Sequence, residues 1–186
     1  MDIVLVHPEI PHNTGCAARL AAATANVLHL VEPLGFSLED RYLKRAGLDY
    51  WPMVELRVHE SWDALRTALA GSSARAFSER LRLFTSRGGT SLFATTFERD
   101  DVLVFGCESK GLPSELVEAH AAQRVYIPVA RGVRSLNLAN VVCLGVYTAM
   151  VRAGVALPDN DGSYEAHPLA NEDLWPISRV RRSSGE

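Results

Sequence analysis

The chain has 186 residues, of which 47% are hydrophobic and 22% charged, and its formal net charge at pH 7 is -3. These values predict an ordinary soluble globular protein of one domain, with or without an appendage. No apolar run is long enough to span a membrane, and the start lacks the basic segment and apolar run of a signal peptide, so we expect a cytoplasmic protein with no membrane partner. Cys16, Cys107 and Cys143 form no CxxC pair and leave an odd count, which argues against a disulfide framework and against a bound metal.

Strand patterns and helical patterns alternate along the chain. Strands are expected at residues 3–6, 27–31, 54–58, 80–86, 101–106 and 124–129. Helices are expected at residues 14–25, at 61–69 with Ser61 as the N-cap, from Pro113 as first residue, and over the apolar run 140–150. This alternation predicts an α/β fold: a mostly parallel sheet with helices on both faces and ligands at the carboxyl ends of the strands.

The composition changes at Leu157, and this change predicts two parts. Residues 1–156 form the main domain, and residues 157–186 form a tail rich in Pro, Gly, Asn, Asp and Ser. For the tail, docking through Leu174, Trp175 and Ile177 and disorder are both open alternatives.

The net charge argues weakly against a nucleic-acid partner, but the charge is unevenly distributed. The tail carries six acidic and three basic residues, so the main domain is neutral. Basic residues gather in "RYLKR", "RLRLFTSR" and "RGVR". Phosphate binding depends on the local field, although any one of these clusters, taken alone, is more simply a solvated surface.

Several familiar catalytic and nucleotide-binding motifs are incomplete or absent. The segment "GCESKG" has the two glycines of a phosphate-binding loop, but Leu112 and Pro113 replace the lysine and hydroxyl residue that should follow. The sequence also lacks GxGxxG, HExxH and GxSxG. Hydrolysis of ATP, ordinary dinucleotide binding and serine hydrolysis are therefore unsupported.

Three segments place Gly, Asn or Ser just beyond a predicted strand: "HPEIPHNTGCAARL", "VFGCESKGLP" and "RSLNLANVV". Each has a simple structural explanation. Asn13 or Thr14 would cap the first helix, Gly106 would end a strand, and Asn137 would start the last helix. The three segments in this order, however, form a specific pattern.

That pattern resembles the SPOUT superfamily of RNA methyltransferases, and within it the small enzymes that 2'-O-methylate the wobble nucleotide of tRNA. The segments that carry the resemblance are "IVLVHPEIPHNTGCAARL", "LHLVEPLGF", "RYLKRAGLDY", "VFGCESKGLP" and "IPV....RSLNLANVV...VY", which together span roughly residues 1–155. The sequence departs from the pattern at His12, Cys16 and Cys107, and the acidic tail lies outside it.

The resemblance implies a deep C-terminal trefoil knot whose loops bind S-adenosyl-L-methionine. Carried over by position, the cofactor-binding residues are Phe84, Thr85, Gly106, Ile127, Ser135 and Leu136. Gly106 lacks a Cβ, so its backbone can approach a flat adenine closely. We expect Gly106→Val to abolish cofactor binding while leaving the fold intact.

The implied reaction is attack of a ribose 2'-hydroxyl on the methyl group of the cofactor, with Arg19, Ser135 and Asn140 as catalytic residues. A guanidinium keeps its proton in proteins, so Arg19 is expected to hold a phosphate and stabilise a developing alkoxide rather than act as a base. Glu108 is expected to hold its loop by accepting backbone N–H groups. Asn137 is expected to secure the helix start and the knot crossing.

The resemblance also implies partners. The tRNA anticodon stem-loop would lie over Arg41, Lys44, Arg45 and Arg134, contacts that position RNA without specifying its sequence. A homodimer would form through the first and last helices, with active sites completed by both subunits. Two alternatives stay open: 2'-O-methylation of ribosomal RNA by the same chemistry, and a non-catalytic RNA-binding knot protein.

Overall fold

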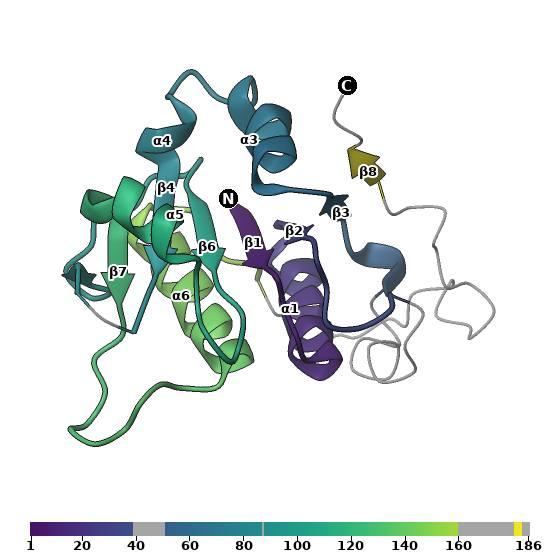
Figure 1. Ribbon diagram of the computed structural model, residues 1–186. Helices are drawn as coiled ribbons and strands as arrows, with labels where there is room; N and C mark the ends of the chain where they lie inside the picture. The colour runs from purple at the N-terminus through teal and green to yellow at the C-terminus, as the bar shows by residue number, and fades with distance from the viewer. Residues whose placement is uncertain (39–50, 87, 160–180, 184–186) are drawn as a thin grey trace.

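The computed structural model describes residues 1–38, 51–86, 88–159 and 181–183, and it contains one eight-stranded sheet (Figure 1). The strands follow the spatial order β5-β7-β4-β6-β1-β2-β3-β8, and every pairing is parallel. Their bounds are β1 Asp2–Val6, β2 Val27–Val31, β3 Leu56–His59, β4 Leu81–Phe84, β5 Thr90–Ser91, β6 Val102–Phe105, β7 Arg124–Tyr126 and β8 Arg181–Ser183. The helices are α1 Pro11–Thr24, α3 Trp62–Ala70, α4 Phe77–Arg80, α5 Ser114–Ala119 and α6 Leu138–Arg152, with short 3-10 turns η1 Trp51–Met53 and η2 Ala121–Gln123.

Helices cover both faces of the sheet. Along the central strand β1, Ile3 and Leu5 point to the face covered by α1 and α6, and Val4 and Val6 point to the opposite face, which α3 covers. Strands buried on both faces need apolar residues at nearly every position, and β6 is buried along its whole length. The expected α/β fold, with a mostly parallel sheet and helices on both faces, is confirmed.

Most expected elements are present, but their ends differ. The Ser61 cap is confirmed: its side-chain oxygen accepts a hydrogen bond from the backbone N–H of Ala64 at 3.1 Å. The prediction that Asn13 or Thr14 caps the first helix is wrong, because α1 begins at Pro11 and both residues are buried inside it. Pro113 is the residue before α5 rather than its first residue.

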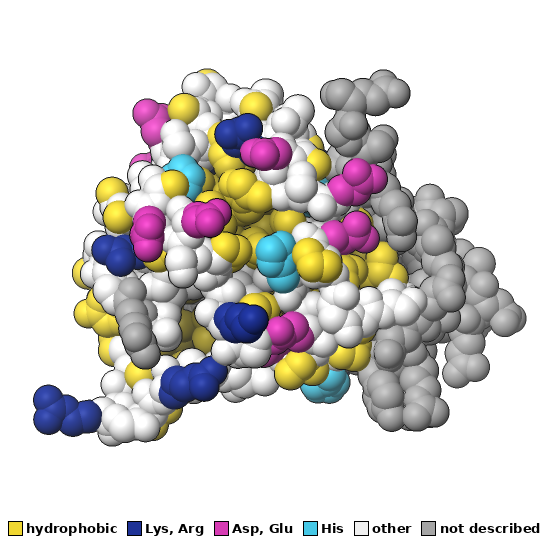
Figure 2. Space-filling model, viewed as in Figure 1, with side chains coloured by type: hydrophobic (Ala, Val, Ile, Leu, Met, Phe, Trp, Pro, Cys, Tyr) yellow, Lys and Arg dark blue, Asp and Glu magenta, His cyan; other side chains and the backbone are white. Residues whose placement is uncertain are grey.

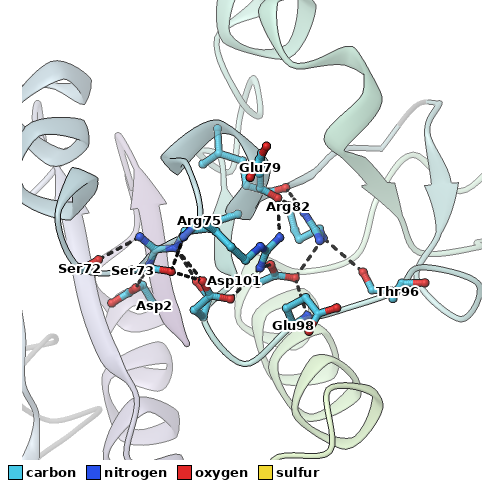
Figure 3. Close-up of polar contacts among 12 residues, drawn as sticks. Asp2, Ser72, Ser73, Arg75, Glu79, Arg82, Thr96, Glu98 and Asp101 are labelled. Carbon is cyan, nitrogen blue, oxygen red and sulfur yellow. Dashed lines mark hydrogen bonds and ion pairs between the residues drawn. The ribbon is translucent and has the colours of Figure 1, made fainter.

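A charged cluster ties the amino ends of β1, β4 and β6 together (Figure 3). Arg75 reaches Asp100 at 2.6 Å and Asp101 at 3.0 Å, and Arg82 reaches Asp101 at 3.1 Å. Arg80 is only 2% exposed, and it donates to Asp2 and to the backbone oxygens of Leu69 and Asp100. The bases in "RLRLF" are therefore structural and lie at the end of the sheet opposite its carboxyl ends.

The tail contributes one described strand. Strand β8 extends the sheet beyond β3 in a parallel pairing, whereas Leu174, Trp175 and Ile177 lie outside the described residues. The domain boundary at residue 156 stays a prediction, as does the trefoil knot. Among the described residues, no helix has the length and apolar character of a membrane span, and no group of three or more His, Cys, Asp or Glu side chains could hold a metal ion.

Candidate active site

A pocket of about 980 Å³ lies at the carboxyl ends of β4, β6 and β7. Most of its wall comes from the last residues of β4 and β6 and from the segments that follow the three strands: residues 84–86, 105–112, 127, 129 and 133–138. Because the strands are parallel, their carboxyl ends meet at one edge of the sheet, where such folds bind ligands. The volume falls within the range of pockets that enclose a small molecule.

All six residues expected to bind the cofactor line this one pocket: Phe84, Thr85, Gly106, Ile127, Ser135 and Leu136. They come from segments up to 52 positions apart in the sequence, and the sheet brings them together. Phe84 stacks on Phe105 with ring centroids 4.4 Å apart. An added Cβ at Gly145 of α6 would lie 2.8 Å from the Phe84 ring, so this glycine lets α6 pack directly behind the pocket.

Gly106 is required by its own loop. A Cβ built at Gly106 would lie 2.1 Å from the backbone of both Gly111 and Leu112. The loop folds back on itself there, with Cys107 and Gly111 exchanging backbone hydrogen bonds of 2.9 and 3.2 Å. Gly106→Val must therefore displace backbone in this loop, so the expectation that it leaves the fold intact is wrong here, whereas the expected loss of cofactor binding stays a prediction.

Glu108 accepts backbone N–H groups as expected, but from a different loop. Its carboxylate takes the N–H of Glu9 at 2.8 Å, the N–H of Ile10 at 3.3 Å and the side-chain amide of Asn13 at 2.9 Å. The carboxylate therefore lies at the N-terminus of α1, where free N–H groups and the helix dipole favour negative charge. This explains why α1 starts at Pro11 without a side-chain cap of its own.

Asn137 starts α6, as expected, because its side-chain oxygen accepts from Ala139 N at 2.9 Å and Asn140 N at 3.4 Å. Its amide donates to the Asn13 oxygen at 3.0 Å. Asn13 therefore joins the starts of α1 and α6 and also lines the pocket. The sequence placed Asn13 only as a cap, since neither of its partners is near it in the chain.

The three residues expected to be catalytic are placed differently. Ser135 lines the pocket. Arg19 lies on the exposed side of α1 and Asn140 on the exposed first turn of α6, and neither belongs to the described lining of the pocket. The catalytic roles of all three stay predictions.

Of the four expected RNA-binding residues, one can be placed. Arg134 lies at the rim of the pocket and donates to the Ser109 carbonyl oxygen at 2.9 Å. Arg41, Lys44 and Arg45 lie outside the described residues. Figure 2 shows basic side chains on the protruding loop between β7 and α6, which contains Arg131 and Arg134.

Comparisons with known proteins agree with this fold. The model of the SpoU rRNA Methylase family matches residues 1–147, and the chain belongs to this family. A relative from Burkholderia pseudomallei, the tRNA (cytidine(34)-2'-O)-methyltransferase, is 47% identical over 154 residues, which are 82% of this chain and 96% of the relative.

Solved structures share the fold. One, described as "Structural insights into the 2-OH methylation of C/U34 on tRNA", is 44% identical with a TM-score of 0.75, over 82% of this chain and 95% of that one. Another, the SpoU methyltransferase AviRb from Streptomyces viridochromogenes in complex with AdoMet, is 20% identical with a TM-score of 0.72, over 82% of this chain and 57% of that one. At that identity, AviRb shows likeness of fold alone.

Proposed function

We propose that this protein transfers a methyl group from S-adenosyl-L-methionine to the ribose 2'-hydroxyl of the wobble nucleotide, cytidine or modified uridine, in cytoplasmic tRNA. The observation that carries the proposal is the match at 47% identity to almost the whole length of a tRNA (cytidine(34)-2'-O)-methyltransferase. The pocket supports it independently, since the residues that the family resemblance assigns to the cofactor all line one cavity.

The pocket suits a nucleoside-based cofactor. Its wall combines the stacked Phe84 and Phe105 rings with loop backbone around Gly106, whose close approach to Leu112 a side chain would prevent. Apolar rings suit a flat base, and backbone N–H and C=O groups can read the edge of that base. When bound, the cofactor supplies an activated methyl group on a sulfonium.

The protein itself has to orient the ribose and ease loss of the hydroxyl proton. Arg19, at an exposed position of α1, suits a role in holding a backbone phosphate and stabilising the developing alkoxide, because a guanidinium presents several donors in a fixed fork. Ser135 lines the pocket and can donate to the ribose or to the methionine end of the cofactor. Asn140, on the first turn of α6, would act in the same region.

The basic loop before α6 supports an RNA partner. It carries Arg131 and Arg134 at exposed positions, and the guanidinium of Arg134 has further N–H groups beyond the one bonded to Ser109. We place the anticodon stem-loop over this loop and over Arg41, Lys44 and Arg45. Such contacts supply affinity and register.

The apolar outer face of α6 supports a homodimer. Leu144, Tyr147 and Val151 are 37%, 38% and 60% exposed, and their spacing puts them on one side of the helix. An apolar helix face of this kind is usually buried against another surface. A second copy of the chain would cover it through α1 and α6.

The test is transfer of labelled methyl from S-adenosyl-L-methionine into total RNA, followed by nucleoside mapping. We expect label at the wobble ribose of tRNA, and a rate reduced about 100-fold in Arg19→Lys, as is typical when one transition-state donor is lost. The family name favours ribosomal RNA as the competing substrate, and label there but not in tRNA would refute the tRNA proposal. An absence of label would favour a non-catalytic RNA-binding protein, and normal turnover of Arg19→Lys would refute the role of Arg19.

A further inference from the structure

Two loops beside the pocket are joined by hydrogen bonds, and each loop supplies a carboxylate that accepts from the other. The first joins β1 to α1 and contains Glu9, and the second follows β6 and contains Glu108 and Ser109. The Glu9 carboxylate accepts from the backbone N–H of Ser109 at 2.9 Å and from its hydroxyl at 2.7 Å. In return, Glu108 accepts from the backbone N–H groups of Glu9 and Ile10. We call these reciprocal contacts of Glu9, Glu108 and Ser109 the loop clasp.

The Glu9 side of the loop clasp rests on a fixed backbone. Pro8 accepts a hydrogen bond from the N–H of Gly35 at 2.9 Å. A Cβ at Gly35 would lie 2.7 Å from the Cα of Glu9, so the two backbones are packed as closely as a glycine permits. Glu9 therefore extends its carboxylate from a supported position although its side chain is exposed. The hydroxyl and the backbone N–H of Ser109 lower the pKa of this carboxyl, as expected for a carboxylate that accepts two bonds.

Ser109 joins three segments of the site. Its N–H and hydroxyl bind Glu9, and its carbonyl oxygen accepts from Arg134 of the loop before α6. Ser109 also lines the pocket, whereas Glu9 does not belong to the described lining. The printed contacts of the Glu9 side chain are both with Ser109, so an effect of this carboxylate on the pocket passes through Ser109.

We propose that Glu9 is a positioning residue for the cofactor pocket. Through its paired contacts with Ser109, Glu9 holds residues 106–111 in the arrangement that binds the cofactor. The inference rests on the proposed function, because it takes the pocket to be the cofactor site. Two charge-assisted hydrogen bonds across a loop restrict it more than a single neutral contact would. The same contacts fix the loop relative to the N-terminus of α1, the helix that carries Arg19.

The test is the dissociation constant of S-adenosyl-L-methionine, measured by calorimetry on the full chain without RNA. We expect Glu9→Ala to raise it about 10-fold. Glu60→Ala removes a carboxylate from an exposed position just before α3 that does not belong to the described lining of the pocket, and it serves as the matched control with unchanged affinity. Wild-type affinity in Glu9→Ala would overturn the inference, whereas no binding by the wild-type protein would instead refute the proposed function.

Substitution by glutamine should affect cofactor affinity differently at the two glutamates, and a general loss of stability would not produce this difference. In Glu9→Gln the amide oxygen can accept from the Ser109 N–H while the amide NH₂ donates to the Ser109 hydroxyl, so we expect affinity within about twofold of wild type. Among the described residues, the donors to Glu108 are all N–H groups, so Glu108→Gln sets an NH₂ group against one of them and should weaken binding about 10-fold. Equal losses in Glu9→Gln and Glu9→Ala would overturn the proposed hydrogen-bonding role.

A double-mutant cycle provides a second route that does not depend on any single variant. If Glu9 acts through Ser109, Glu9→Ala should cost less affinity in a Ser109→Ala background than in wild type, because half of the paired contact is already gone. Strictly additive losses would overturn this route of action. Circular dichroism of each variant confirms that the fold is retained.

Discussion

Three polar side chains form a buried chain across strands β1, β2 and β3. His29 Nδ1 lies 2.8 Å from His59 Nε2, and His29 Nε2 lies 3.1 Å from Asp2 Oδ1. Both histidines are at most 1% exposed, on the face of the sheet that α3 covers. The two rings hydrogen-bond to each other when one of the two facing nitrogens carries a proton and the other accepts it.

Burial of His59, with His29 and Arg57 close by, lowers the pKa of its imidazole to about 4. An unfolded histidine has a pKa of about 6.5, so between these values the unfolded chain binds a proton that the folded protein does not. The contribution of His59 to the free energy of unfolding is therefore fully present above about pH 6.5, and it decreases as the pH falls from about 6.5 toward 4. In this window the free energy of unfolding should fall by about 1.4 kcal/mol per pH unit on account of this group.

Urea unfolding of wild type and His59→Gln at several pH values between about 7 and 4.5 measures this effect. The variant should be less stable at neutral pH but should show a shallower dependence on pH. His120→Gln, changed at a half-buried position after α5, controls for the loss of a histidine as such. Parallel curves for wild type and His59→Gln would contradict the prediction.

At the scale of elements, the contact of α6 with the sheet depends on one glycine. Gly145 faces the stacked pair Phe84 and Phe105, and an added Cβ would lie 2.8 Å from Phe84 and 3.3 Å from Phe105. Gly145→Ala gains about 1 kcal/mol of helix propensity. Overpacking of a buried core usually costs about 1–3 kcal/mol, and the aromatic pair is closely packed, so we expect net destabilisation of about 1 kcal/mol.

Gly71→Ala is the matched comparison. No atom of the described residues lies within 4 Å of an added Cβ there, and the backbone φ of -97° suits alanine. We expect its free energy of unfolding to stay within about 0.5 kcal/mol of wild type. Because Phe84 lines the pocket, Gly145→Ala should also weaken cofactor binding in calorimetry, whereas Gly71→Ala should not. An unfolding free energy for Gly145→Ala equal to or above that of wild type would show that Phe84 can move aside.

The sequence predicts elements well where local patterns determine them. Apolar runs such as 3–6 and 27–31 place strands correctly, and Ser61 and Asn137 cap their helices through contacts within three residues. The start of α1 could not be predicted, because the N–H groups of Glu9 and Ile10, just before the helix, are satisfied by Glu108, almost 100 positions away. Strand β5 is two residues long and leaves too short a pattern to detect, and strand β8 contains no apolar residue.

The same distinction holds in the site. Gly106 and Ser135 stand out in recognisable motifs, so the family resemblance could assign them to the pocket, where the structure places them. Glu9 has no such signal, since its importance arises only when Ser109 lies beside it. Arg80 and Arg82 show the opposite case, a residue group that stands out in the sequence but does not belong to the site. Their basic cluster suggested phosphate binding or a solvated surface, whereas in the structure Arg80 pairs with Asp2 and Arg82 pairs with Asp101.

At the scale of the whole molecule, α1 and α6 pack against each other on the same face of the sheet (Figure 1). The inner side of α6 supplies Val142, Val146, Ala149 and Met150 to the core. Its outer side presents the exposed Leu144, Tyr147 and Val151. The core of one chain therefore buries only the inner side of the run "NVVCLGVYTAM", and the apolar residues of its outer side remain exposed.

Leu144→Lys tests whether a second copy of the chain covers the exposed outer side of α6. A lysine in an apolar interface must be desolvated without a partner, so we expect the variant to be monomeric in light scattering at a concentration where wild type is a dimer. Ala68→Lys adds the same charge to an exposed position of α3 on the opposite face of the sheet, and it should leave the dimer intact. If both subunits complete each active site, the monomeric variant should also lose methyl transfer, while its unfolding stays cooperative. A monomeric wild-type protein would refute the dimer, and a fully active monomeric variant would show that one chain holds a complete site.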